Sequence, residues 1–366
     1  MRKKEKRPGS EVRSMGENAY FAASNSARGF QSYYPECFDT DEIVRLYAVK
    51  GGPGTGKSRF LREVAEVGKT KGYVPDYIYC SSDPDSLDGI ILRRGERGIA
   101  LLDATAPHVY EPNRPGYREE IVNLGAFWNA GMLREESERI AKLNREKGMA
   151  YRMAYRYLAG YEKMTENRNA LVEPCFRENA IEKYAEKLLR EEPNGSGFSP
   201  QTALIRAIGM RGEILLDTFF ANAKRIFLVE DCRGAGYLLM QKLYAAVERK
   251  GTTVRVSKNP ILSEQIDALA LPESGTVFAV ARPEECDYPF RQISMRRFVE
   301  TEKMKEIRSQ INYAERMRRA MLAGARDCLR EVRKVHFQIE EIYMKAMDFS
   351  AKETFTKAFC DSLFRD

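Results

Sequence analysis

One segment constrains the fold of this chain more than any other: it reads YAVKGGPGTGKS and runs from Tyr47 to Ser58. The segment fits the pattern G-x-x-x-x-G-K-[ST], with an apolar run before it and a helix-forming run after it. Glycines allow the backbone to curl until successive N–H groups point at one anion, and the N-terminus of the next helix adds partial positive charge. We therefore predict a phosphate-binding loop between a buried strand and a helix.

The expected nucleotide contacts come from this loop and the first helical turn: Gly51, Gly52, Pro53, Gly54, Thr55, Gly56, Lys57, Ser58 and Arg59. Lys57 is expected to reach the β- and γ-phosphates, and the Ser58 hydroxyl to ligate Mg²⁺. No N-K-x-D motif is present to select guanine, so ATP with Mg²⁺ is the expected cofactor. A glycine-rich turn that matches by chance is the alternative, and the flanking strand and helix count against it.

Composition narrows the class of protein. No apolar run approaches the roughly 18 to 20 residues that a membrane span needs, and the charged N-terminus lacks the apolar core of a signal peptide. The seven cysteines include no C-x-x-C pair, which favours neither a disulfide framework nor a zinc site. We expect a cytoplasmic α/β protein with no membrane partner.

The net charge of +7 is unevenly distributed. The first 13 residues hold six basic side chains against Glu5 and Glu11, so this segment supplies more than half of the excess. Residues 1–17 are therefore predicted to be a disordered basic tail. Because the remainder is only slightly basic, nucleic acid is a weakly supported partner.

A second apolar strand near the loop ends in a carboxylate. Residues 73–80 are predicted to form one strand, residues 81–88 a capped short helix or acidic loop, and residues 98–103 a buried strand ending at Asp103. A carboxylate at the tip of a parallel strand faces the phosphate crevice, so Asp103 is predicted to orient Mg²⁺; the alternative is a cap for the next turn. Ala104 follows where many motor ATPases have a catalytic glutamate, which predicts that this mode of water activation is absent.

The proline-rich segment 104–117 is predicted to be a loop over or beside the phosphates. It contains His108, one of only two histidines, which is expected either to sense the γ-phosphate or move a proton, or to be a hydrogen-bonded loop residue. The catalytic candidates are thus Lys57, Asp103 and His108. Further candidates for a general base are Glu111, Asp83 and Asp85.

Charged helices follow. Apolar residues recur at helical spacing within 127–190, which predicts an amphipathic helical hairpin. An arginine finger could come from one of its arginines, although most of them are expected to be solvated: Arg134, Arg145, Arg152 and Arg156. The turn-rich segment 193–200 is the predicted boundary between a domain at 18–192 and a domain at 201–366.

The second domain repeats the pattern of the first, including a hairpin at about 298–366. The segment 229–238 aligns with 49–58, with Gly234 under Gly54, and Ala325 and Leu329 fall under Ala154 and Leu158. The chemical positions differ between the two copies: Tyr237 replaces Lys57, Leu238 replaces Ser58, Asp231 replaces Gly51, Val280 replaces Asp103 and Glu285 replaces His108. The fold prediction is therefore a tandem duplication of a P-loop NTPase unit, a mostly parallel sheet flanked by helices, whose second copy is a pseudo-domain that does not bind nucleotide.

Several motifs together resemble a poorly characterised bacterial family of duplicated P-loop ATPases: FAASNSARGF, GGPGTGKS, CSSDPDSLDG, DATAPH and IVNLG. The resemblance covers nearly the whole chain after the tail and implies an ATP-binding protein with two P-loop units. In that family the second unit often keeps its own P-loop, and a glycine is usual at the position of Ala104. This chain departs from both features.

Three functions are compatible with these patterns. The first is an ATP-binding NTPase that hydrolyses slowly or acts as a switch on an unknown protein partner. The second is a small-molecule or nucleotide kinase, with the hairpin as a lid over an acceptor. The third is a nucleic-acid-associated ATPase that uses the tail and the helix carrying Arg316, Arg318 and Arg319.

Overall fold

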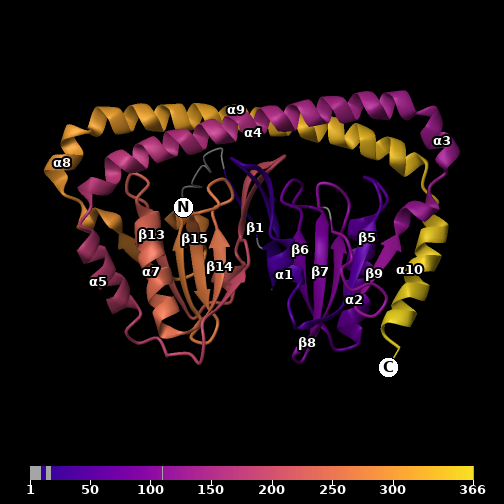
Figure 1. Cartoon of the computed structure of the whole chain (residues 1–366), viewed down its shortest axis with the longest axis horizontal. Coiled ribbons are helices and arrows are strands. Elements are labelled where there is room, and N and C mark those ends of the chain that lie inside the picture. The colour runs from indigo at the N-terminus through magenta and orange to yellow at the C-terminus, as the bar shows by residue number, and fades with distance from the viewer. Residues whose placement is uncertain (1–9, 14–17, 109, 366) are drawn as a thin grey trace, which may run out of the picture.

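The computed structural model describes residues 10–13, 18–108 and 110–365. It is an α/β structure with two six-stranded mixed sheets side by side, and two long helices lie across both of them (Figure 1). Within the described residues no helix has the length and hydropathy needed to cross a membrane.

The first sheet surrounds the loop singled out above. Its strand order is β2 (Ala19–Phe21), β6 (Val74–Tyr79), β7 (Leu87–Arg94), β8 (Arg97–Asp103), β5 (Ile43–Lys50) and β9 (Glu119–Asn123). The predicted strands at 73–80 and 98–103, and the predicted buried strand before the glycine-rich loop, are confirmed. Strand β7 was not predicted, and its first two residues fall in the segment 81–88 that was assigned to a capped short helix or acidic loop. It runs antiparallel to both of its neighbours. The sheet is consequently mixed, because β7 turns back at the left-handed Gly95 to enter β8.

The second sheet repeats this arrangement. Its strand order is β10 (Ser199–Thr202), β14 (Thr253–Lys258), β15 (Ile266–Leu271), β16 (Thr276–Val280), β13 (Arg225–Glu230) and β17 (Arg291–Ser294). The strand β15 is again antiparallel to both neighbours, and the other three pairings are again parallel. The two sheets therefore share strand order and strand direction throughout.

Each sheet is accompanied by a tight hairpin. These hairpins are β3 (Ala23–Ser26) with β4 (Gly29–Ser32), and β11 (Arg206–Gly209) with β12 (Gly212–Leu216). Gly29 and Gly212 have the same φ of +96°, a left-handed conformation that favours glycine. Strand β1 (Ser10–Arg13) pairs in parallel with β12, so the prediction of a disordered tail is wrong for residues 10–13, whose backbone is held by the second half. Residues 1–9 and 14–17 of that predicted tail lie outside the described residues.

The two long helices are α4 (Ser137–Val172) and α9 (Arg308–Lys345). The predicted hairpin within each half is wrong, since α4 and α9 pack lengthwise against each other instead (Figure 1). Their contact buries Ala154 and Leu158 against Ala325 and Leu329. The shortest α-helices of the described residues are α1 (Tyr34–Phe38), α3 (Ala130–Glu135), α6 (Thr218–Ala221) and α8 (Thr301–Glu306).

After crossing, each long helix delivers a shorter helix to the opposite sheet. Helix α5 (Glu178–Leu188) packs on α7 (Gly236–Lys250) beside the second sheet, and α10 (Phe349–Leu363) packs on α2 (Lys57–Thr70) beside the first (Figure 1). Equivalent backbone hydrogen bonds join the end of each long helix to the other half. Asn129 N donates to Ala346 O after α9, and Glu300 N donates to Cys175 O after α4. The segment 193–200, in which β10 already begins, thus separates the two sheets but not the helices that cover them.

Candidate functional site

The glycine-rich loop lies between β5 and α2, as predicted. Gly54 and Gly56 have φ values of +72° and +76°, which a residue with a β-carbon rarely adopts. Helix α2 begins at Lys57, and none of the described side chains caps its N-terminus. Its first N–H groups and helix dipole therefore remain available to an anion in front of the loop.

Lys57 is folded back onto the loop. Its Nζ donates to the carbonyl oxygens of Gly51 and Gly52, at 2.8 Å in each case, and lies 3.5 Å from Asp103 Oδ2. Asp103 is at the end of β8, and its Oδ1 accepts a hydrogen bond from Thr105 N. Burial raises the pKa of the Asp103 carboxyl, while Lys57 opposes that shift. The structure thus brings the predicted lysine and carboxylate together.

Ser58 is the other predicted magnesium ligand. Its Oγ lies in the same cavity wall and accepts a hydrogen bond of 2.9 Å from Leu87 N. This bond uses one lone pair and orients the hydroxyl at the start of β7. A second lone pair remains, which is what ligation of a cation requires.

A cavity of about 550 Å³ opens in front of the loop. Pro53 to Ser58 form one wall, and residues 105–108 together with Asp103 form another. The roof comes from both long helices and from the β11–β12 turn, through Lys147, Tyr151, Tyr155, His336, Glu340 and Met210. Its volume lies within the range of about 300–1,000 Å³ that is usual for small-molecule sites.

Helix α9 covers the loop at close range. A β-carbon at Gly54 would lie 2.6 Å from the carbonyl oxygen of Glu340, and one at Gly52 would lie 3.2 Å from the Tyr343 ring. The Glu340 side chain is close as well, since the same β-carbon at Gly54 would lie 3.2 Å from its Cγ. Burial and the nearby Asp83 raise the pKa of Glu340, and Lys57 and the Gly54 N–H partly offset that rise. A carboxylate from the second half therefore already lies at the edge of the anion cradle.

His108 lies on the cavity wall and is only 6% exposed. Its Nε2 is 3.0 Å from Asp88 Oδ2, and its ring stacks on Tyr34 with a centroid separation of 4.9 Å. Burial lowers the pKa of His108, but the Asp88 carboxylate outweighs this and leaves the pKa above its ordinary value. His108 is thus held by a buried carboxylate, in an arrangement that could hold or move a proton.

The other predicted residues are divided. Asp83 lines the cavity, whereas Asp85 pairs with Arg13 and Arg211, and Glu111 pairs with Lys50. Arg59 turns toward Glu63 and Glu353 and lies outside the cavity wall. The proposed arginine fingers are all exposed, and none of them lines the cavity: Arg134, Arg145, Arg152 and Arg156.

One arginine of the nucleic-acid hypothesis is also engaged internally. Arg318 donates to Thr165 and Tyr161 and pairs with Glu315, so it ties α9 to α4. Arg316 and Arg319 are exposed.

Sequence reasoning missed several cavity residues. Cys80 precedes, and Asp88 ends, the segment 81–88 that was predicted as a capped short helix or acidic loop, and recognising β7 would have placed both beside the glycine-rich loop. His336 and Glu340 come from α9, which begins in the second half of the chain. No local sequence pattern predicts that this helix covers the first sheet. Tyr151 and Tyr155 fall within the predicted hairpin, and no role at the cavity was predicted for either.

The corresponding turn of the second half lies between β13 and α7. There Asp231 Oδ1 accepts a 2.8 Å hydrogen bond from Gly236 N, at the start of the helix. The Arg168 guanidinium lies against Gly234, where an added β-carbon would be 1.8 Å from its Cζ. The Tyr237 hydroxyl donates to Glu173. Side chains of the protein therefore occupy the space in front of this turn.

Comparison with known proteins adds no relative: no family model, curated protein or solved structure matches the chain.

Proposed function

We propose that the chain is a tandem duplication of a P-loop NTPase unit in which only the first copy binds Mg·ATP. Support for the duplication comes from the shared strand order and from the two hairpins with identical left-handed glycines. Support for the asymmetry comes from the two turns, since Lys57 and Ser58 have Tyr237 and Leu238 as counterparts.

The observation that carries the proposal is the cradle at the start of α2. Two left-handed glycines, an uncapped helix N-terminus and an adjacent ammonium group face one cavity. These are the features that bind a polyphosphate through main-chain N–H groups and a side-chain cation. In the proposed complex Lys57 exchanges its carbonyl partners for phosphate oxygens, and Ser58 and Asp103 hold Mg²⁺, which neutralises phosphate charge.

A switch role follows from the position of Glu340. Its side chain lies beside Gly54, and the Gly54 N–H lowers its pKa, so the phosphates of ATP would compete with Glu340 for this part of the loop. Because α9 starts in the second half and leads into α10 on the first, displacing Glu340 would shift an element that joins both halves. We expect hydrolysis to be slow, since Ala104 provides no carboxylate to activate water.

A kinase is the second candidate, and the cavity itself favours it. The aromatic rings of Tyr151 and Tyr155 line the wall contributed by α4, and the bonded pair His108 and Asp88 lies on the same cavity. The hydroxyl group of an acceptor bound there would lie beside the His108–Asp88 pair. ADP formation that depends on an added metabolite would distinguish a kinase from a switch.

Titration calorimetry with Mg·ATP tests the nucleotide proposal. We expect one ATP per chain, and a loss of at least about 100-fold in affinity for Lys57→Ala, since charge-assisted hydrogen bonds to phosphate are removed. The control is Tyr237→Phe, at the matching position of the second turn, which should change the affinity by less than about threefold. Equal losses in the two variants, or adenosine binding as tightly as ATP, would contradict the proposal.

A further inference from the structure

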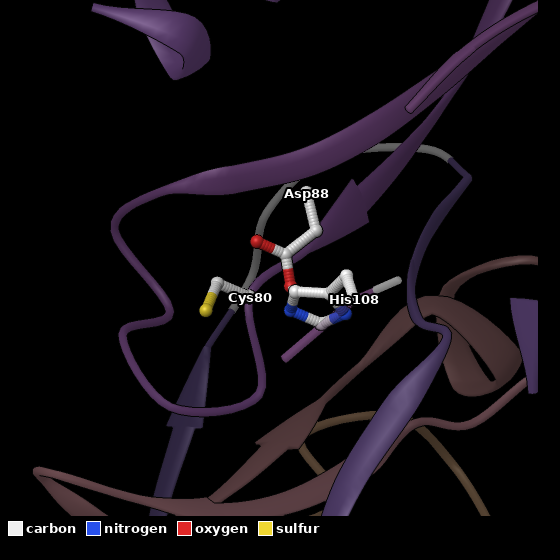
Figure 2. Close-up of side chains that lie close together, drawn as sticks. All are labelled: Cys80, Asp88 and His108. Atoms are coloured by element: carbon white, nitrogen blue, oxygen red, sulfur yellow. The ribbon is translucent and has the colours of Figure 1, made fainter. Parts of the chain in front are cut away.

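Three side chains of different elements meet beside the phosphate loop. Cys80 follows β6, Asp88 belongs to β7 and His108 lies in the loop after β8, and Figure 2 shows the three together. One ligand atom of each lies within 4.8 Å of the ligand atoms of the other two, and all three residues line the cavity. A thiol, a carboxylate and an imidazole are the ligand types of zinc and related divalent metals.

Strand register identifies the equivalent residues in the second half. Ile78 pairs with Gly89 as Ser257 pairs with Ala268, which makes Cys80 equivalent to Asn259 and Asp88 equivalent to Asp267. Val49 pairs with Asp103 as Val229 pairs with Val280. His108 and Glu285 both lie five residues beyond those strand ends, and each closes the same N–H to carbonyl turn.

In the second half a side-chain cation serves this position. The Arg206 guanidinium lies 3.6 Å from Asp267 Oδ2 and 3.3 Å from Glu285 Oε1, and Asn259 donates to Asp267. Burial raises the pKa of Asp267 to about 6, and Arg206 opposes that rise. Arg206 is thus the cation shared by both carboxylates, and Arg282 also pairs with Glu285, at 3.1 Å.

The first half lacks that guanidinium. The hairpin register that pairs Ser26 with Gly29 and Gly209 with Gly212 makes Ala23 the equivalent of Arg206. Ala23 is buried and uncharged. The three neighbouring positions also differ in part between the halves. The second half has Asn259, Asp267 and Glu285 where the first half has Cys80, Asp88 and His108.

One further observation fits a metal. The backbone N–H of Asp83 donates to the Cys80 sulfur at 3.5 Å, and such a bond stabilises a ligating thiolate.

We propose that Cys80, Asp88 and His108 bind a divalent transition metal of the zinc type, distinct from the Mg²⁺ expected at Ser58 and Asp103. The metal provides the positive charge that Arg206 provides in the second half. With three protein ligands on a cavity wall, the fourth position opens into the cavity and is available to water or to an oxygen atom of a second substrate. The sequence argued against zinc because it has no C-x-x-C pair, and the structure assembles the ligands from three separate elements.

The test uses full-length protein treated with a chelator, returned to metal-free buffer and titrated with Co²⁺ alone, then with Zn²⁺. We expect one Co²⁺ per chain with a thiolate-to-cobalt charge-transfer band, and displacement of Co²⁺ by Zn²⁺. Cys80→Ser should abolish the band, and His108→Gln should weaken metal binding by about 10- to 100-fold or more. The control Cys232→Ser, which changes another partly buried cysteine, should keep both the band and the affinity.

The absence of the band in the wild-type protein, or its persistence in Cys80→Ser, would overturn the proposal without reference to any variant that fails to fold. The result is independent of nucleotide, because the titration contains none. ATP binding measured with Mg²⁺ in the presence of a chelator selective for transition metals tests the nucleotide proposal separately.

Discussion

The two glycine-rich turns of this molecule share a left-handed glycine but differ in what lies in front of them. In the first, Gly54 and Gly56 are left-handed and a cavity lies in front of the loop. In the second, Gly234 is left-handed as well, but Asp231 takes the N–H of Gly236 and Arg168 fills the space beside Gly234. The comparison teaches that a glycine-rich turn can keep a left-handed glycine while side chains of the protein take its N–H donor and fill the space in front of it.

The covering helices show the same contrast. Helix α9 places Glu340 beside Gly54 of the first turn, and a cavity remains in front of the loop. Helix α4 places Arg168 beside the second turn. The Arg168 side chain is only 5% exposed and pairs with Glu315 at 2.9 Å. The first contact leaves a cavity in front of the loop, whereas the second is a buried internal ion pair.

The largest expected effect is on stability, from Arg168→Met. Glu315 would lose one of its two arginines and the space beside Gly234 would lose its charge, which should reduce the free energy of unfolding by about 2–4 kcal/mol. Urea denaturation measures this loss. The control Arg152→Met, at an exposed position of the same helix, should change stability by less than about 0.5 kcal/mol.

The same variant sharpens the comparison between the turns. Removing Arg168 does not free the N–H of Gly236, because Asp231 still accepts it. ATP stoichiometry should therefore stay at one per chain. A second bound nucleotide in Arg168→Met would show that Arg168 alone silences the second turn.

A smaller effect is expected at the first turn, from Glu340→Gln. The amide keeps nearly the same shape but removes a negative charge from the cradle, so ATP affinity should rise about 3- to 10-fold, corresponding to about 0.7–1.4 kcal/mol. The matched control is Glu341→Gln, one residue further along α9, whose carboxylate is exposed and pairs with Lys345. Unchanged or weaker ATP binding by Glu340→Gln would mean that the carboxylate does not compete with phosphate.

Much of the first turn could be predicted from the sequence because its information is local. The glycine spacing, the strand before Gly51 and the strand ending at Asp103 are contiguous patterns, and the structure places them as expected. The alignment of Ala154 with Ala325 also came from sequence, yet it could not reveal that the two residues lie in one hydrophobic cluster between α4 and α9.

The remainder could not be predicted, for physical reasons. An amphipathic helix specifies that one face is buried but not which surface buries it, so α4 and α9 were assigned to hairpins inside their own halves. Strand β7 was missed in part because its residues Leu87 to Leu92 are all buried and show no alternation. The roof of the cavity depends on both of these features, and His336 and Glu340 were missed with it.

The smallest expected effect concerns pH and again compares the two covering helices. Burial, reinforced by Lys147 and Lys57, lowers the pKa of His336 to about 4. The equivalent residue of α4 is Thr165, which does not titrate. The unfolded chain takes up a proton near pH 6.5, which the folded protein refuses until about pH 4, so acidification favours unfolding in this window. We expect His336 to cost about 0.5–1 kcal/mol of stability between about pH 7.5 and about pH 6.

The variant His336→Thr isolates this contribution. Asp267, with its pKa near 6 raised by burial, titrates in the same range with the opposite sign, since the folded protein holds that proton more tightly than the unfolded chain does. Only the difference between wild type and variant is therefore informative. Urea denaturation at several pH values should show that the free energy of unfolding of the variant rises relative to that of the wild type as the pH falls. A difference that stays constant with pH would mean that His336 binds protons equally well in the folded protein and in the unfolded chain.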